Sequence, residues 1–106
     1  MKETVYIVLE KAAKLSGDKD LKKLNVKIMD VCDVCCSNKD IENKINHLEV
    51  TVLDVDGQKH VRKLVSLTDL INIIEAQVDN VDISPVGENQ VMLDYERKKS
   101  NNKLIT

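Results

Sequence analysis

The feature of this sequence that most constrains its fold is the segment of residues 66–96, whose pattern predicts one helix followed by two strands. Ser66 or Thr68 can cap the helix, because a short hydroxyl side chain accepts a hydrogen bond from a free backbone N–H of the first turn. Helical spacing places a set of aliphatic side chains on one face, namely Leu67, Leu70, Ile71, Ile74 and Val78. We therefore predict a main amphipathic helix over residues 67–79. Ile73 lies beside this stripe, which indicates a wide buried face.

Two alternating segments follow this helix. Residues 81–84 alternate apolar and polar side chains, and residues 91–96 do the same. The residues between them are of types typical of a turn, namely Pro85, Gly87, Glu88 and Asn89. Because two strands with one apolar face cannot stand alone in water, we expect the helix to pack on this C-terminal strand pair.

The first part of the chain predicts further short elements. Residues 4–9 are apolar and alternate, which indicates a buried strand. The lysine-rich residues 11–25 predict a polar connector that turns at Gly17 and Asp18. Residues 26–29 predict a second short strand. A helical turn is expected after it from the spacing of four side chains, namely Ile28, Val31, Cys32 and Cys35.

A second helix and a hairpin are predicted in the middle of the chain. Ser37 or Asn38 can cap a short helix, and residues 48–52 then alternate as a strand does. The Asp-Gly dipeptide at 56–57 is favoured in two-residue hairpin turns. We therefore expect residues 61–65 to return as the partner strand.

Together these elements predict an α+β fold with small mixed or antiparallel sheets. A chain of 106 residues is expected to form one domain. We place the folded part at residues 1–97, as one unit or as two small subdomains of residues 1–47 and 48–97, and a polar basic tail at residues 98–106. The pattern of the second subdomain also resembles the small modules that build rings in secretion systems, a likeness of fold from which function does not follow.

The composition argues against several classes of function. The formal net charge is −2 and the only aromatic residues are Tyr6 and Tyr95. The chain therefore offers neither the basic surface nor the stacking side chains of a nucleic-acid-binding protein. No apolar run has the length needed to cross a bilayer, and the first residues lack the pattern of a secretory signal. We expect the chain by itself to be soluble.

Cys32, Cys35 and Cys36 form a C-x-x-C-C cluster, the most conspicuous candidate site. Structural zinc takes four ligands, usually as two separated pairs, and neither histidine has that spacing to the cluster. A redox motif needs an activated thiol, whereas the acidic neighbour Asp33 would raise a thiol pKa. We interpret the cysteines as small core residues. Metal binding or redox chemistry at these three thiols is the alternative.

No pattern of catalytic or cofactor-binding residues is present. Residues 54–57 (DVDG) fit a hairpin turn better than a calcium loop, because the glycine comes fourth instead of sixth and the twelfth residue is Val65 instead of a glutamate. The chain has three glycines, too scattered for a phosphate-binding loop. We therefore predict that the protein is not an enzyme and has no cofactor.

A basic cluster lies near the end of the sequence, formed by Arg97, Lys98, Lys99 and Lys103. It fits a solvated terminus, which is common in small domains. It also fits a juxtamembrane segment, because lysine and arginine gather on the cytoplasmic side of transmembrane helices. On the residues alone both interpretations stay open. In the second, these four side chains are the interaction residues next to the membrane.

The order of the segments resembles the soluble N-terminal region of the stage V sporulation protein AA family of endospore-forming bacteria. The segments that carry the likeness are TVYIVL at 4–9, VKIMDV at 26–31, VSLTDLI at 65–71, VDISPVGE at 81–88 and DYER at 94–97. The lysine-rich segment and the cysteine cluster depart from the family pattern. No role is therefore carried over to them.

The resemblance implies a non-catalytic assembly domain of a spore inner-membrane complex. In that family the soluble part precedes transmembrane helices, and the complex moves dipicolinic acid with its calcium into the developing spore and out again during germination. The implied partners are other stage V sporulation protein A membrane subunits, a second copy of the chain, and the membrane through the helices that would follow. Nucleic acid is not among them.

The resemblance also implies a location. It places the full protein in the inner membrane of the spore or forespore, and the basic cluster favours the cytoplasmic side for this domain. The alternative function, which the residues suggest without the family, is a cytosolic cysteine-based redox or metal-binding small protein.

Overall fold

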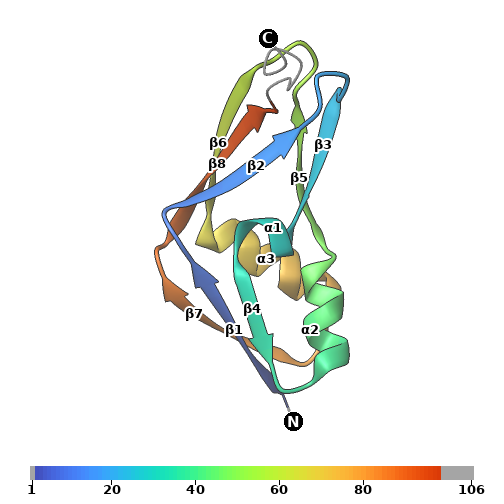
Figure 1. The fold of residues 1–106 in the computed structure, drawn as a ribbon. Coiled ribbons are helices and arrows are strands. Elements are labelled where there is room, and N and C mark those ends of the chain that lie inside the picture. The colour runs from blue at the N-terminus through green and yellow to red at the C-terminus, as the bar shows by residue number, and fades with distance from the viewer. Residues whose placement is uncertain (1, 99–106) are drawn as a thin grey trace, which may run out of the picture.

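Two long extended segments run side by side through the molecule and organise the fold. The computed structural model describes residues 2–98. One segment consists of β1 (Glu3–Leu9) and β2 (Ala12–Gly17), and the other of β7 (Val81–Gly87) and β8 (Gln90–Arg97). β1 pairs with β7, and β2 pairs with β8, both in parallel (Figure 1). The beginning and the end of the domain are thus joined along their whole length.

The remaining strands add antiparallel neighbours. β4 (Asp33–Cys36) joins β1 and gives a sheet of order β4-β1-β7. β6 (His60–Ser66) joins β8 and gives a sheet of order β2-β8-β6. β3 (Lys23–Lys27) and β5 (Glu49–Asp54) form a separate pair. Every sheet therefore combines strands from before and after residue 47, so the two parts of the sequence interleave. The predicted α+β class with small mixed or antiparallel sheets is confirmed.

The helices lie beside the β4-β1-β7 sheet (Figure 1). They are α1 (Ile28–Val31), α2 (Lys39–Asn46) and α3 (Leu67–Gln77). The side chain of Asn38 accepts hydrogen bonds from the backbone N–H groups of Asp40 and Ile41 at 3.0 and 3.3 Å. Ser66 Oγ accepts one from the N–H of Asp69 at 3.1 Å. Both caps are among those that the sequence predicts.

Alternate side chains of the strands meet the helices in one hydrophobic core. The two long segments contribute Val5, Ile7, Leu9, Val91, Leu93 and Tyr95, and α3 contributes Leu70 and Ile74, all of them buried. The prediction of a buried first strand and of an amphipathic main helix is confirmed. The helix ends at Gln77, two residues before the expected end.

The molecule is elongated, with extents of 61 × 23 × 21 Å. We call the part formed by β1, β4, β7 and the three helices the helical half, and the part formed by β2, β3, β5, β6 and β8 the strand half (Figure 1). β1 begins at the far end of the helical half, and β8 finishes at the far end of the strand half. Of the helices in residues 2–98, none combines the length and the apolar character that crossing a bilayer takes.

Two predicted pairings are wrong, because they assume that strands adjacent in the sequence pair with each other. The expected C-terminal strand pair does not form, since β7 pairs with β1 whereas β8 pairs with β2 and β6. The helix α3 accordingly contacts β6 and β7 from two different sheets. The hairpin expected at 56–57 does not form either, since β5 pairs with β3 and β6 with β8.

The lysine-rich segment 11–25 is also not a connector, because it contributes β2 and part of β3. The strand predicted at residues 26–29 ends at Lys27, and α1 follows directly. The predicted helical turn is shorter than expected, because Cys35 lies in β4. In each case the strand pairs with a segment far away in the sequence, so the local pattern of residues does not reveal it.

Gly87 lets the second long segment bend without reversing. Its φ is +94°, and a Cβ added there would lie 2.3 Å from the carbonyl oxygen of Leu9. Beyond the bend, the N–H of Glu88 donates to the carbonyl of Leu9 at 3.0 Å, and the N–H of Met92 donates to that of Lys11 at 2.9 Å. The predicted turn is therefore a bend that carries the parallel pairing from one half of the molecule to the other.

We expect Gly87→Ala to lower the free energy of unfolding by more than about 1–3 kcal/mol, the usual cost of a residue with a side chain in such a backbone conformation, because the added Cβ would also overlap the carbonyl oxygen of Leu9. Urea denaturation followed by circular dichroism measures it. Gly57→Ala is the matched control, because Gly57 also has a positive φ of +72° but no atom lies within 4 Å of an added Cβ. Equal losses in the two variants would contradict a special role for the close approach to Leu9.

Candidate interaction surface

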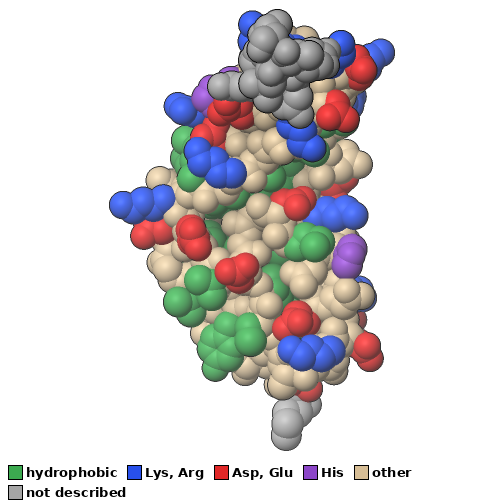
Figure 2. Space-filling model, viewed as in Figure 1, with side chains coloured by type: hydrophobic (Ala, Val, Ile, Leu, Met, Phe, Trp, Pro, Cys, Tyr) green, Lys and Arg blue, Asp and Glu red, His purple; other side chains and the backbone are tan. Residues whose placement is uncertain are grey.

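The outer face of the β4-β1-β7 sheet carries exposed apolar side chains. The alternation that buries the inner residues of β1 turns Tyr6 and Val8 outward. The register places Cys35 beside Tyr6, and Val86 beside Val8. Tyr6 and Val86 are each 48% exposed. We call these four residues the apolar face, and Figure 2 shows hydrophobic side chains at the surface of this half of the molecule.

Acidic side chains border the apolar face. Met29 of α1 is 53% exposed and lines a shallow hollow together with Val8. The same hollow is lined by three carboxylates, those of Glu10, Asp30 and Asp33. An exposed apolar patch with a polar rim is typical of a surface that binds another protein. The acidic part of this rim favours a partner with basic groups, whereas Lys2 and Lys39 line a second hollow beside Tyr6 and Cys35.

The free edge of β7 is poorly suited to pairing with another strand. Asn80 accepts a backbone hydrogen bond from Glu3 at 2.8 Å, and Glu88 donates one to Leu9 at 3.0 Å. Because parallel strands turn alternate residues toward a given neighbour, the odd-numbered residues of β7 direct their backbone groups away from β1. Pro85 is one of them and has no N–H to donate. A proline on an edge strand discourages strand addition, which leaves the face as the better contact surface.

The three cysteines do not converge on one point. Cys35 and Cys36 are consecutive in β4, so their side chains point to opposite faces of the sheet. Cys35 is exposed, whereas Cys32 and Cys36 are buried. Burial, reinforced by the charge of Asp33, raises the pKa of the Cys32 thiol to about 12. The interpretation of the cysteines as core residues is therefore confirmed for Cys32 and Cys36. It is wrong for Cys35, because the alternation of β4 turns that side chain to the exposed face.

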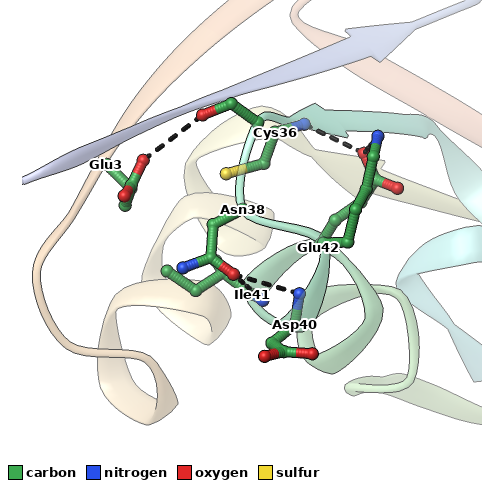
Figure 3. Close-up of polar contacts among 8 residues, drawn as sticks. Glu3, Cys36, Asn38, Asp40, Ile41 and Glu42 are labelled. Carbon is green, nitrogen blue, oxygen red and sulfur yellow. Dashed lines mark hydrogen bonds and ion pairs between the residues drawn. The ribbon is translucent and has the colours of Figure 1, made fainter.

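A small polar network fixes the connection between β4 and α2 (Figure 3). Glu42 Oε1 accepts a hydrogen bond from the backbone N–H of Cys36 at 3.0 Å, and Lys39 Nζ lies 3.4 Å from the same oxygen. The bond from Cys36 is the main reason why the pKa of Glu42 is lowered. Ser37 Oγ lies 3.5 Å from Glu3 Oε2 on β1. These contacts hold the β4 strand, and with it Cys35, in place beside β1.

The two histidines lie in different halves of the molecule. His47 follows α2, with its ring Nδ1 2.8 Å from the carbonyl oxygen of Asn43. His60 begins β6 in the strand half. Within residues 2–98 no three side chains of histidine, cysteine, aspartate or glutamate lie together in a group able to hold a metal ion.

Asp94 is the centre of a charged cluster on the outer face of the β2-β8-β6 sheet. Lys14 Nζ donates to Asp94 Oδ2 at 3.1 Å, and Arg62 Nε lies 3.6 Å from Oδ1. His60 Nε2 contacts Oδ1 as well. The hydrogen bonds from His60 and Lys14 lower the pKa of Asp94 to about 2. One carboxylate thus ties together all three strands of the sheet.

No local pattern in the sequence marks the cluster around Asp94. Asp94 is 80 residues from Lys14 and 34 residues from His60. The side chains meet only because β2 and β6 lie on either side of β8. Of the predicted basic cluster, Arg97 ends β8 and Lys98 follows it, while Lys99 and Lys103 lie outside the described residues.

The chain is similar to a known protein family and to several solved structures. A family model described as stage V sporulation protein AA matches residues 2–99 of the chain. Among solved structures, the chain is similar to a functionally unknown protein from Eubacterium ventriosum, with a TM-score of 0.75 and 26% sequence identity over 92% of this chain and 98% of that one. No curated protein matches the chain. The family match therefore includes both halves of the fold and the whole apolar face.

We expect one thiol per chain to react rapidly with a thiol-specific reagent such as dithiobisnitrobenzoate in the native protein. Cys35 is exposed, whereas burial keeps the other two thiols out of reach of the reagent. Three thiols should react after denaturation. Cys35→Ser should abolish the rapid phase, and a variant that retains it would show that Cys32 or Cys36 is accessible.

We expect Asp94→Asn to lower the melting temperature at pH 7, because it removes the charge that Lys14, His60 and Arg62 contact. The folded state lowers the pKa of Asp94 from 3.8 to about 2, so its stabilisation is present above pH 3.8 and is lost as the pH falls toward 2. The difference in melting temperature between wild type and variant should therefore shrink over this range. Glu96→Gln in the same strand is the control, and a loss as large and as pH-dependent in that variant would contradict the role of Asp94.

Proposed function

The chain belongs to the stage V sporulation protein AA family, and from this premise we propose that it is a non-catalytic assembly domain of a spore inner-membrane complex. The family gives the protein a role in sporulation. The proposed complex is the one that moves dipicolinic acid with its calcium across that membrane. The apolar face, with its acidic rim, is the observation on which the assembly role depends.

The geometry of the apolar face supports a contact with protein. Tyr6 and Val86 project from neighbouring strands of a sheet whose inner face is buried in the core, so their positions are rigid. Rigid aromatic and aliphatic anchors within a polar rim are the usual centre of a protein interface. The hollow beside them is shallow and carries acidic groups, which suits a basic side chain of a partner.

The two ends of the elongated domain are suited to two different contacts, one with the membrane and one with a partner subunit. β8 ends in the strand half, where Arg97 and Lys98 lie, so any membrane helix that follows would start from that end. The apolar face lies in the helical half, away from that end. A partner subunit could reach it without competing with the membrane. On this arrangement the domain stands on the cytoplasmic side, with its basic end toward the bilayer.

The alternative of a cysteine-based redox or metal-binding protein gains no support from the geometry. Two of the thiols are core residues and the third points to the opposite face of the sheet. The assembly role is therefore the better supported of the two functions.

Co-purification of the full-length protein with the other membrane subunits of the complex tests the proposal. We expect the double variant Tyr6→Ser and Val86→Ser to reduce recovery of those subunits about tenfold or more, since loss of central interface residues typically costs more than 1 kcal/mol each. Circular dichroism should show an unchanged fold, because both side chains are exposed.

Leu64→Ser is the matched control for this experiment. Leu64 is 50% exposed but lies in β6 of the strand half. It should leave recovery unchanged. Equal recovery with wild type and the double variant would overturn the assignment of the apolar face as the assembly surface.

A further inference from the structure

Charge is separated along the length of the molecule. The strand half, residues 12–27, 49–66 and 90–98, holds 10 lysine and arginine side chains and 7 carboxylates. The helical half, residues 2–11, 28–48 and 67–89, holds 4 basic side chains and 11 carboxylates. The strand half is thus positive by 3 charges and the helical half negative by 7. The small net charge of the whole chain conceals this separation.

Basic side chains gather at the tip of the strand half, where β8 ends. Lys19 and Lys22 lie in the connection from β2 to β3, and Lys59 precedes β6. All three are exposed, and Figure 2 shows lysine and arginine side chains around this end of the molecule. With Lys23, Arg97 and Lys98 counted as well, the tip holds six basic side chains. Five carboxylates share it, those of Asp18, Asp20, Asp54, Asp56 and Glu96, so the excess of positive charge there is small.

Backbone hydrogen bonds attach the end of β8 to this tip. Arg97 donates its N–H to the carbonyl of Lys59 at 2.8 Å, and Lys98 donates to that of Gly17 at 2.9 Å. Arg97 and Lys98 are therefore fixed next to the loops that carry the exposed lysines.

The outer face of the same half adds two cations. Asp94 is engaged by Lys14, His60 and Arg62 together, so its single negative charge is outweighed by the cations around it. Positive charge consequently extends from the tip along this face. Glu96 of β8 is a second acidic side chain on this face, so the positive charge there is partly offset.

We propose that the tip of the strand half lies on anionic lipid headgroups, with Lys19, Lys22 and Lys59 as the contacting side chains. This inference rests on the proposed function for the presence of a membrane. It adds that the folded domain itself contacts the lipid. Bilayer surfaces with anionic lipids attract basic groups and repel carboxylates. The same surface that holds the tip therefore repels the helical half and directs it away, so the domain stands upright on the membrane.

Sedimentation of the chain with lipid vesicles tests this inference. The probes are vesicles of phosphatidylcholine mixed with phosphatidylglycerol, and vesicles of phosphatidylcholine alone. We expect binding to the first and not to the second. Raising the ionic strength from about 0.1 M to about 1 M shortens the Debye length from about 10 Å to about 3 Å and should release the protein.

The triple variant Lys19→Glu, Lys22→Glu and Lys59→Glu should weaken binding to the anionic vesicles about tenfold or more. The control carries the same change of charge at Lys2, Lys11 and Lys44, which lie in the helical half. It should bind within about twofold of wild type if the tip makes the contact. Equal losses in the two variants, or equal binding to both kinds of vesicle, would overturn the inference.

The outcome is separable from that of the assembly experiment. The tip variant should still recover the partner subunits in the full-length protein, because its changes lie away from the apolar face. Loss of lipid binding with retained recovery supports a direct lipid contact. Loss of recovery with retained lipid binding would instead identify the tip as a contact for an acidic protein.

Discussion

The parallel pairing of the two long segments is the constraint on which the rest of this structure depends. It joins residues near the start of the domain to residues near its end, so a loop of about seventy residues must be closed before the pairing forms, at an entropic cost that grows slowly with loop length. Once formed, it gives β4 and β6 an edge to join, and it fixes which side chains of β1 and β8 enter the core. The same pairing decides which side chains are left outside. Tyr6 and Val86 meet on one outer face, and Lys14 and Asp94 on the other, only because their strands are neighbours.

Local signals in the sequence predict the elements well and their pairing poorly. The caps at Asn38 and Ser66 act within one turn of a helix, so the residues alone reveal them. The strand β2 is harder to predict from the residues alone, because its outward side chains are small or charged and only Leu15 clearly marks its inner face. The segment around Gly87 has the composition of a turn, yet the chain continues in the same direction. A glycine and a proline indicate a change of backbone conformation, and whether that change reverses the chain depends on the strand alongside it.

The difference between local signals and long-range pairing also explains which candidate sites could be predicted from the sequence. The cysteine cluster is compact in the sequence, but the period of a strand separates Cys35 from Cys36. Asp94 and its cations are scattered in the sequence, but the sheet brings them together. Close spacing in the chain is therefore a poor guide to a site in a protein whose strands pair over long distances. The apolar face could be predicted in part, since the alternation of β1 identifies two faces, but which of them is covered by helices is decided by the fold.

The acidic rim of the apolar face also bears on the kind of assembly that this domain can enter. In a symmetric dimer only residues near the twofold axis meet their own copies, so Glu10, Asp30 and Asp33 would face themselves only if the axis passed through the hollow that they line. Like charges brought together at an interface disfavour association, so the acidic rim acts against that arrangement and for a partner with complementary charge. If the basic tip is held at the membrane, a head-to-tail chain of copies is disfavoured too, because the tip is already engaged. Both arguments favour the proposed contact of the acidic half with a different subunit over a contact between copies of this chain.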